Sequence, residues 1–194
     1  MAQWVSATVL PETGALAGFI DDRADALAGR DLEVPLLSGI TTHSPQPDQL
    51  HVMAIADPKA KLAVGSSLLQ RGARFLTFIH PRALIGSRVT IGVGAVFCPN
   101  AVVSSDARIG DFVTVNLGCT VGHDTELGDG CTLSCQVDIA GWAKIGKGAF
   151  FGSHATVLPR ATVGDFAKVG ACSAVLRSVD EGTTVFGVPA RRVA

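Results

Sequence analysis

Residues 103–139 read VSSDARIGDFVTVNLGCTVGHDTELGDGCTLSCQVDI, and an apolar residue recurs at every sixth position. The period holds without a slip from Ile79 to Val175, at 17 consecutive anchor positions. With an apolar content of 47%, chance would give such a run with a probability on the order of a few in a million. The anchors are Ile79, Ile85, Ile91, Phe97, Val103, Ile109, Val115, Val121, Leu127, Leu133, Ile139, Ile145, Phe151, Val157, Val163, Val169 and Val175. A fixed hexapeptide period is typical of a β-solenoid, in which each coil buries its apolar face on its neighbours.

Two further positions of each hexad carry a pattern. The fourth residue after the anchor is small or β-branched, as at Ala95, Val113 and Cys119, and glycine directly follows nine of the 17 anchors. We expect this dense glycine to serve tight corners that need backbone freedom. Three hexads per coil predict a triangular prism of between five and six coils. The expected fold of residues 79–179 is therefore an all-β, parallel β-helix.

Composition narrows the class of protein. No apolar run of the 194 residues approaches the roughly 18 that a membrane-spanning helix requires, and the first ten residues lack the Lys or Arg of a secretory signal. The net charge of −1, without a basic patch, argues against nucleic acid or a membrane as a partner. Five cysteines, with Cys119 and Cys131 on the small inward position, indicate reduced thiols in a cytoplasmic protein.

Residues 1–78 have a different texture and predict a small α/β domain. Residues 57–58, Asp-Pro, have the form of an N-cap followed by a proline at the first helical position, and Gly72 would close the helix. A strand, a helix and a strand within about 30 residues form a βαβ unit, so a small α/β domain precedes the solenoid; the family resemblance described below implies that it is a truncated Rossmann-like domain. Residues 180–194 form a tail that we expect to fold back over the last coil. The segments involved are the apolar runs 4–10 and 15–20, a short strand near 34–37, a buried strand at 50–56, a helix over about 58–71 and a strand at 75–79.

His123 is the outstanding candidate for chemistry on the solenoid. It lies two residues after an anchor, so it points outward near a corner, and a coil of three hexads stacks it beneath Gly141 and above Ser105. A glycine above the imidazole leaves open space and an accessible backbone N–H, which could stabilise an oxyanion. Histidine suits a general base near neutral pH, and the adjacent Asp124 would raise its basicity. The spacing alone does not establish this role. It favours the alternative that His123 is a solvated corner histidine beside a solvated aspartate.

At this point the sequence resembles a family, the hexapeptide-repeat acyltransferases, and within it the sugar O- and N-acetyltransferases of the sialic-acid and bacillosamine type. The resemblance covers about residues 15–194. It implies a homotrimeric left-handed β-helix that binds acetyl-CoA between subunits, needs no metal, and acetylates a 4-amino sugar on a nucleotide carrier in polysaccharide biosynthesis. Its motifs are residues 18–22 (GFIDD), 54–57 (AIAD), 78–81 (FIHP), Asn116 with His123-Asp124, and 187–191 (GVPAR).

The resemblance also implies residue roles. His123 is similar to the general base, Asp124 to its acidic neighbour, and Gly141 to the glycine whose N–H faces the thioester oxygen. Asn116 falls where the acceptor sugar is contacted. The remaining implied contacts are Asp21, Asp22 and Ala56 for the nucleotide sugar and Thr132, Ser153 and Ala171 for acetyl-CoA.

Three departures from the family pattern concern the acceptor and the cofactor. Residues 1–14 contain one glycine, Gly14, and no histidine, so the Gly-rich phosphate loop of the family is missing from them. Thr132 replaces a histidine of some members, and Ala56 replaces a glycine that lies close to a ligand. The missing loop and the alanine at position 56 leave open that the protein is an O-acetyltransferase of a sugar or other small alcohol. A non-catalytic trimeric scaffold is the remaining alternative.

Zinc is a further possibility for this fold, because β-helical γ-class carbonic anhydrases bind zinc with three histidines. The spacings between His80, His123 and His154 are not multiples of three hexads, so the three lie in different columns of the coil, which argues against zinc. We interpret His80 as structural. His154 could approach acetyl-CoA or be solvated, and His43 and His51 receive no role.

Overall fold

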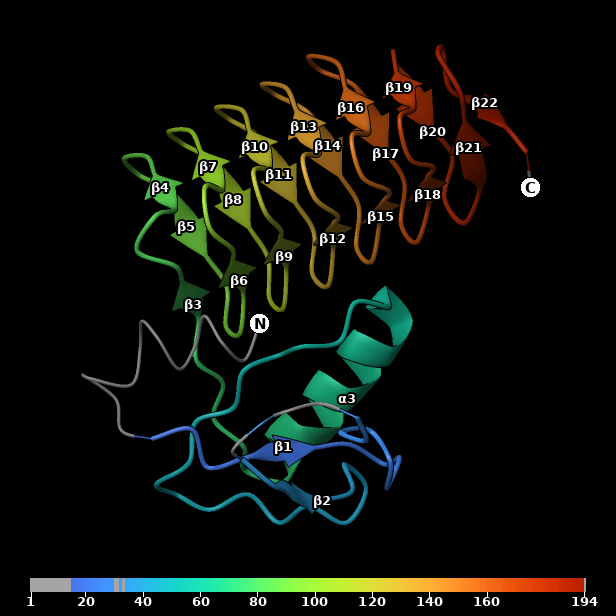
Figure 1. Ribbon diagram of the computed structural model, residues 1–194. Helices are drawn as coiled ribbons and strands as arrows, with labels where there is room; N and C mark the ends of the chain where they lie inside the picture. The colour runs from blue at the N-terminus through green and yellow to red at the C-terminus, as the bar shows by residue number, and fades with distance from the viewer. Residues whose placement is uncertain (1–14, 30–31, 33, 194) are drawn as a thin grey trace.

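The computed structural model describes residues 15–29, 32 and 34–193, so the predicted run 4–10 lies outside the described residues. From residue 78 the chain winds into a solenoid of short strands that form three sheets along its length (Figure 1). Sheet 1 contains β3 (Phe78–Ile79), β6 (Val96–Phe97), β9 (Thr114–Val115), β12 (Thr132–Leu133), β15 (Phe150–Phe151), β18 (Lys168–Val169), β21 (Thr184–Phe186) and β22 (Arg191–Arg192).

The other two sheets have six strands each. Sheet 2 contains β4 (Leu84–Ile85), β7 (Val102–Val103), β10 (Thr120–Val121), β13 (Asp138–Ile139), β16 (Thr156–Val157) and β19 (Ala174–Val175). Sheet 3 contains β5 (Thr90–Ile91), β8 (Arg108–Ile109), β11 (Glu126–Leu127), β14 (Lys144–Ile145), β17 (Thr162–Val163) and β20 (Ser178–Val179).

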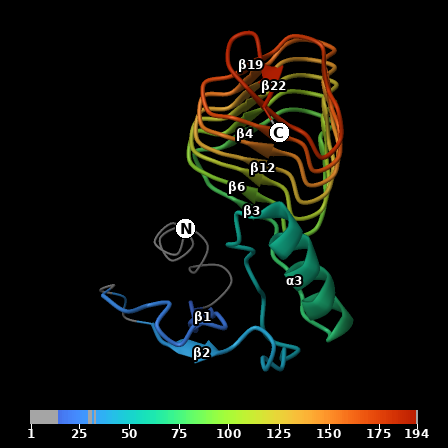
Figure 2. The same ribbon diagram turned by 90° about the vertical axis from the view of Figure 1, so that its right-hand side faces the viewer.

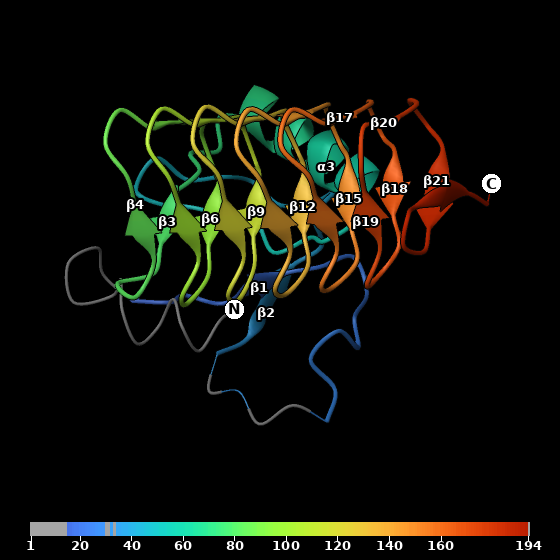
Figure 3. The ribbon, with the colours of Figure 1, turned by 90° about the horizontal axis from the view of Figure 1, so that it is seen from above.

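The register confirms the predicted coil of three hexads. Thr120 of β10 pairs in parallel with Asp138 of β13 and with Val102 of β7, which lie three hexads after it and three hexads before it. Seen from above, the strands of successive coils lie side by side along one axis (Figure 3). A position in the hexad therefore becomes a column of side chains along the solenoid.

The anchors and the small residues four positions later fill the interior. Val115, Leu133 and Phe151 stack in one column with no exposed area, and Cys119 and Cys131 are equally buried, as their position predicted. Burial of a side chain of the anchor type contributes about 1.5–3 kcal/mol. The hexapeptide pattern is thus the pattern of a continuous core.

The corners correct the expected role of glycine. The residue in the left-handed region is the third after the anchor, for example Asp124 at φ 57° and Gly130 at φ 69°, whereas the glycines that directly follow an anchor are not left-handed. Those glycines instead allow close approach of coils: a Cβ on Gly86 would lie 2.7 Å from the backbone N of Ser105 in the next coil. These glycines therefore mark where the coils stack closely. The freedom to adopt a left-handed backbone is needed two residues after them in the hexad.

The ladder continues past the predicted end of the repeat. Val163 pairs with Val179 and Val169 with Val185, so the last coil is two residues shorter than the others, and the hexad frame slips between β19 and β20. The buried side chains of Val179 and Val185 extend the core. β22 then turns back and pairs in antiparallel with β21.

The N-terminal region forms less than the predicted Rossmann-like domain. Among the described residues it contains a parallel strand pair, β1 (Phe19–Ile20) with β2 (Leu36–Ser38), and one helix, α3 (Pro58–Gln70). Asp57 caps α3 as predicted, since its carboxylate accepts a hydrogen bond of 2.8 Å from the N–H of Ala60. The expected strand at residues 50–56 is reduced to a single parallel bridge between His51 and Phe75. Met53 and Ile55 pack instead in a cluster with α3 and Phe112 of the solenoid, and Val52 packs in a second cluster on sheet 1, because an apolar run indicates burial and not strand pairing.

α3 lies against sheet 1 (Figure 2). Lys61 of α3 is completely buried there, and its Nζ donates to Thr114 Oγ1 at 2.9 Å, to Thr132 Oγ1 at 2.6 Å and to the carbonyl of Cys131 at 3.3 Å. Burial lowers the pKa of Lys61 to about 8. No helix in the described part of the chain is long and apolar enough to cross a bilayer.

Candidate active site

His123 and Asp124 occupy the corner between β10 of sheet 2 and β11 of sheet 3. Both side chains are half exposed, and the parallel register places Gly141, one coil further along the chain, directly beside the imidazole. A Cβ at position 141 would lie 2.9 Å from His123 Nε2. Only glycine leaves this side of the ring open.

The hydrogen bond to Asp124 fixes which ring nitrogen of His123 can act as a base. Nδ1 lies 2.8 Å from Asp124 Oδ2. Because a carboxylate only accepts, Nδ1 carries the proton and the lone pair of the neutral ring is on Nε2. Nε2 is the ring atom nearest to the Cβ position of Gly141, so the basic nitrogen faces the Gly141 backbone.

Gly141 has an unused backbone donor. Its backbone N–H makes no hydrogen bond to any described residue, whereas its carbonyl accepts from the N–H of Arg160 at 3.1 Å. A backbone N–H beside a general base is the arrangement that stabilises an oxyanion during acyl transfer.

Trp142 also packs against His123, a contact that the sequence interpretation missed. The two rings meet edge to face at 82°, with centroids 4.3 Å apart, and the guanidinium of Arg160 lies 4.5 Å from an indole ring centroid. Asp124, Trp142 and Arg160 occupy one column, each in the left-handed region. Counting in steps of three hexads from Asp124 would have found both residues.

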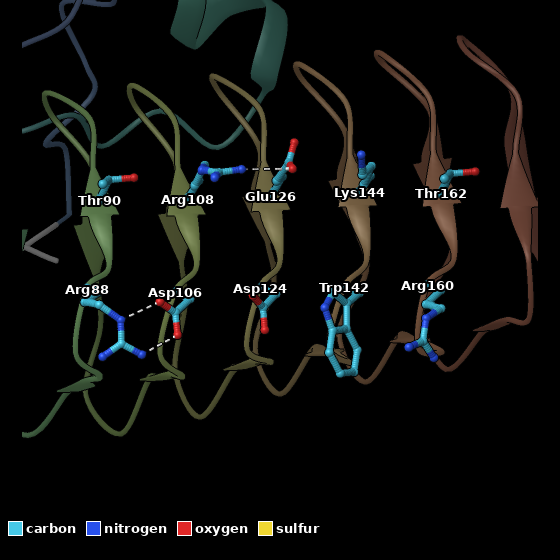
Figure 4. Close-up of a pocket in the computed structure, with 10 residues that line it drawn as sticks. All are labelled: Arg88, Thr90, Asp106, Arg108, Asp124, Glu126, Trp142, Lys144, Arg160 and Thr162. Carbon is cyan, nitrogen blue, oxygen red and sulfur yellow. Dashed lines mark hydrogen bonds and ion pairs between the residues drawn. The ribbon is translucent and has the colours of Figure 1, made fainter.

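A groove of about 720 Å³ runs over sheet 3 and this corner (Figure 4). Arg88 binds Asp106 with two hydrogen bonds of 2.7 Å, which lower the pKa of the Asp106 carboxyl, and Arg108 binds Glu126 at 3.2 Å. The lining residues are Arg88, Thr90, Asp106, Arg108, Asp124, Glu126, Trp142, Lys144, Arg160 and Thr162.

The predicted sugar and acetyl-CoA contacts lie elsewhere on the chain. Asn116, Ser153 and Ala171 occupy the corner between sheets 1 and 2, at the opposite end of the sheet 2 strands from His123. Asn116 Oδ1 accepts from the N–H of Leu117 at 2.8 Å. Thr132 is buried beneath α3, where its hydroxyl donates to the carbonyl of Ala56 at 2.8 Å.

The two predicted N-terminal carboxylates have partners in their own region. Asp21 pairs with Arg23 at 3.2 Å, and Asp22 Oδ1 accepts from the N–H and the hydroxyl of Thr41, each at 3.1 Å. One copy of the chain therefore brings together His123, Asp124 and Gly141, but not the predicted substrate contacts.

The other histidines have separate surroundings. His80 is buried, and its Nδ1 accepts from the N–H of Arg82 at 3.0 Å, while His154 is exposed. His43 and His51 face each other, with their Nε2 atoms 2.9 Å apart. Within the described ranges, no three His, Cys, Asp or Glu side chains are grouped to hold a metal ion.

Comparisons with known proteins identify the class. No protein-family model and no curated protein matched the sequence. Among solved structures, the acetyltransferase domain of PglB from Neisseria gonorrhoeae is 25% identical, with 98% of this chain and 94% of that chain covered and a TM-score of 0.88. WeeI from Acinetobacter baumannii is 30% identical, with coverages of 98% and 94% and a TM-score of 0.74.

PerB from Caulobacter crescentus, a GDP-perosamine N-acetyltransferase, is 29% identical, with coverages of 84% and 80% and a TM-score of 0.78. These likenesses span the solenoid and the N-terminal region together. The fold and these likenesses thus define a β-solenoid acyltransferase. The chain belongs to the hexapeptide-repeat sugar N-acetyltransferases.

Proposed function

We propose that this protein transfers the acetyl group of acetyl-CoA to the amine of a nucleotide-linked 4-amino sugar. The arrangement that carries the proposal is His123 Nε2 beside the backbone of Gly141, with Nδ1 held by Asp124. The structures of similar proteins support the substrates: the PglB domain was solved with acetyl coenzyme A, and PerB with CoA and GDP-perosamine.

Transfer is direct. The amine nitrogen attacks the thioester carbonyl, a C–N bond forms, and His123 Nε2 takes the proton that the nitrogen loses. The N–H of Gly141 donates to the oxyanion, which collapses as the C–S bond breaks, and CoA leaves as the thiol after it receives a proton. Burial raises the pKa of Cys119 to about 11, so this thiol is a poor nucleophile and does not supply an acyl-enzyme.

The active protein is a homotrimer, in which a neighbouring copy completes each site. A partner copy is supported by the positions of the proposed contacts, since Asn116, Ser153 and Ala171 lie at the end of the sheet 2 strands away from His123, and the number of three chains is what the family resemblance implies. A site that uses both corners needs two chains. Asp21, Asp22 and Ala56 then contact the nucleotide sugar, and Thr132 lies near the cofactor. We place the protein in the cytoplasm, in a pathway of polysaccharide biosynthesis.

The test is an assay of acetyl-CoA with a panel of UDP-, dTDP- and GDP-linked 4-amino sugars, in which released CoA and the acetylated product are both measured. An N-acetylated sugar formed in equal amount to CoA supports the proposal. Product acetylated on oxygen would replace it by the O-acetyltransferase reading. If no acetyl group is transferred and acetyl-CoA does not bind, the remaining interpretation is a non-catalytic trimeric scaffold.

A further inference from the structure

The loop formed by residues 39–43, directly after β2, determines the orientation of Asp22. Thr41 donates to Asp22 Oδ1 from its backbone N–H and from its hydroxyl, each at 3.1 Å. A Cβ on Gly39 would lie 2.9 Å from the same oxygen, so the loop backbone is in close contact with the carboxylate. Asp22 is exposed, and its Oδ2 accepts no hydrogen bond from a described residue. The loop therefore holds one oxygen of this carboxylate and leaves the other available.

Two attachments hold the loop 39–43 in the N-terminal region. The first is Arg71, at the end of α3, which donates to three loop carbonyls, those of Ile40 at 2.8 Å, Thr41 at 3.0 Å and His43 at 2.9 Å. The second is the buried side chain of His43, whose Nε2 lies 2.9 Å from Nε2 of His51. The loop is thus joined to α3 by a guanidinium and to residue 51 by a pair of imidazoles.

The other hydrogen bonds of the two rings fix where their protons lie. His51 Nδ1 is 3.2 Å from the carbonyl of Arg74. A carbonyl only accepts, so Nδ1 carries the proton and Nε2 of the neutral ring is an acceptor. His43 therefore donates from Nε2, and its Nδ1 accepts from the hydroxyl of Ser38 at 3.1 Å. The bond between the rings requires that His51 is uncharged.

Acid breaks this bond when the pair binds its second proton. A first proton is accommodated on Nδ1 of His43, because the hydroxyl of Ser38 can turn and accept a hydrogen bond. A second proton has to bind Nε2 of His51, where it places two N–H groups face to face between two positive rings. The two histidines then repel each other, and this attachment of the loop is lost.

The surrounding charges favour the uncharged pair. Arg71 and Arg74, the residues whose groups bond to the loop and to His51, are both cations. Among the described residues, no carboxylate, that of Asp22 included, lies within ion-pair distance of either ring. Burial, together with the charges of His51 and Arg71, lowers the pKa of His43. The open state consequently binds more protons than the closed state, and rising pH favours the closed state.

We propose that His43 and His51 are positioning residues that form a pH-sensitive clasp for Asp22, an inference that rests on the proposed function through Asp22 as a contact of the nucleotide sugar. The uncharged pair closes the loop 39–43 onto Asp22, and the doubly charged pair releases it. The clasp is closed above the ordinary pKa of histidine, about 6.5, and weakens as the pH falls below it. The protein thereby loses affinity for its acceptor in mild acid.

Hydrogen exchange of the loop amides tests the clasp without any substrate. Mass spectrometry would follow the peptide that contains residues 40–43, in the wild type and in two variants of His51, at about pH 7.5 and about pH 5. His51→Gln retains an acceptor for His43 and cannot be charged, whereas His51→Leu has no acceptor. His154→Gln, which replaces an exposed histidine of the solenoid, is the control and should keep the pH response of the wild type.

We expect the protection factor of this peptide, corrected for the intrinsic exchange rate, to fall about tenfold or more in the wild type at the lower pH. His51→Gln should retain its protection at both pH values, and His51→Leu should be unprotected at both. An equal pH response of the wild type and His51→Gln would overturn the clasp. Wild-type protection in His51→Leu would also overturn it. If His51→Leu does not fold, the comparison of the wild type with His51→Gln still decides.

Isothermal titration with the panel of nucleotide-linked 4-amino sugars tests the positioning of Asp22. At about pH 5, the wild type should bind the best acceptor roughly tenfold more weakly than His51→Gln, and the two should bind equally at about pH 7.5. His123 is common to both proteins, so its own titration cancels in this comparison. Acetyl-CoA affinity should differ less than about twofold between them, because the loop is remote in sequence from the proposed cofactor contacts.

The clasp and the proposed function can fail separately. If the loop opens in acid as expected but no nucleotide sugar binds the wild type at either pH, the function fails and the clasp stands. If the loop opens and the wild type still binds the sugar as tightly as His51→Gln does at about pH 5, the positioning of Asp22 is overturned and the function stands.

Discussion

The imidazole of His123 and the backbone of Gly141 approach so closely that a single methyl group on Gly141 would lie 2.9 Å from Nε2. The parallel register between β10 and β13 creates this relationship by stacking the two residues in consecutive coils. Gly141 is not in the left-handed region, so alanine fits its backbone. Gly141→Ala is thus a steric change at the proposed base with little effect on the fold.

We predict that Gly141→Ala lowers kcat by roughly 10- to 100-fold, because the ring must turn away from its position, and small displacements of reacting groups have effects of this size. The measurement is acetyl transfer to the best acceptor of the panel. The control is the same substitution in a His123→Ala background, where no ring is displaced and Gly141→Ala should change kcat less than about twofold. Equal losses in both backgrounds would contradict the steric account.

Asp124→Asn tests the proton position on His123. An amide can donate to Nδ1, which would move the proton of the neutral ring to Nε2 and remove the lone pair from the reacting side. We expect kcat to fall by roughly 10²-fold or more, with the KM for acetyl-CoA unchanged. Asp165→Asn is the control, since this exposed carboxylate accepts from the N–H of Lys147 at another corner. Wild-type kcat in Asp124→Asn would show that the hydrogen bond to Asp124 has no part in the reaction.

The buried Lys61 predicts a pH dependence of stability. Its pKa falls from 10.5 to about 8 on folding, so between these pH values the unfolded chain binds more protons than the folded chain. Stability from this group therefore rises with pH across that window. We expect the free energy of unfolding of the wild type to rise relative to that of Lys61→Met by roughly 2–3 kcal/mol between pH 7 and pH 10.

The comparison with Lys61→Met is needed because buried thiols act in the opposite direction. Burial raises the pKa of Cys98 and Cys119 to about 11 and that of Cys131 to about 12, so their contribution is lost as the pH rises above 9. Both proteins contain these thiols, so the difference between the two denaturation curves removes Cys98 and Cys119, while the buried Cys131, whose charge interacts with that of Lys61, keeps its proton in both folded proteins up to pH 10. A difference that is flat or falls with pH would contradict the desolvation of Lys61.

The cap of α3 gives a prediction about the N-terminal region. Asp57→Ala removes the acceptor for the N–H of Ala60 and should lower stability by about 1 kcal/mol. Asp57→Ser keeps an oxygen acceptor and should stay close to the wild type in the same chemical denaturation at fixed protein concentration. Equal stability of the three proteins would mean that packing of α3 on sheet 1, and not the cap, holds the helix end.

The solenoid could be predicted from the sequence because its core is built from a local repeat. Phe97, Val115 and Leu133 are buried at the positions that the six-residue count assigns. The same count placed His123 beside Gly141, since a parallel register without bulges turns a sequence spacing into a spatial contact. The sequence could thus predict the part of the site that consists of the column of His123 and Gly141 and the residues next to it.

The remaining features depend on contacts between distant segments, which no local pattern contains. Lys61 reads as a solvated lysine on a short helix, yet it is buried against Thr114 and Thr132, 53 and 71 residues away. Residues 50–56 read as a strand because they are apolar, although they form a single bridge and place their buried side chains in two clusters against the solenoid. The shortened last coil was not predicted, because it lacks two residues of the repeat. The period of six therefore fails there, although the strands continue.

The central claim is that His123 is the general base, and the most direct measurement is the kcat of His123→Ala for acetyl transfer to the best acceptor, beside its affinity for acetyl-CoA. The account predicts a fall of roughly 10²–10⁴-fold in kcat, with acetyl-CoA affinity and the β-sheet circular dichroism of the wild type retained. Full wild-type kcat in His123→Ala would contradict it.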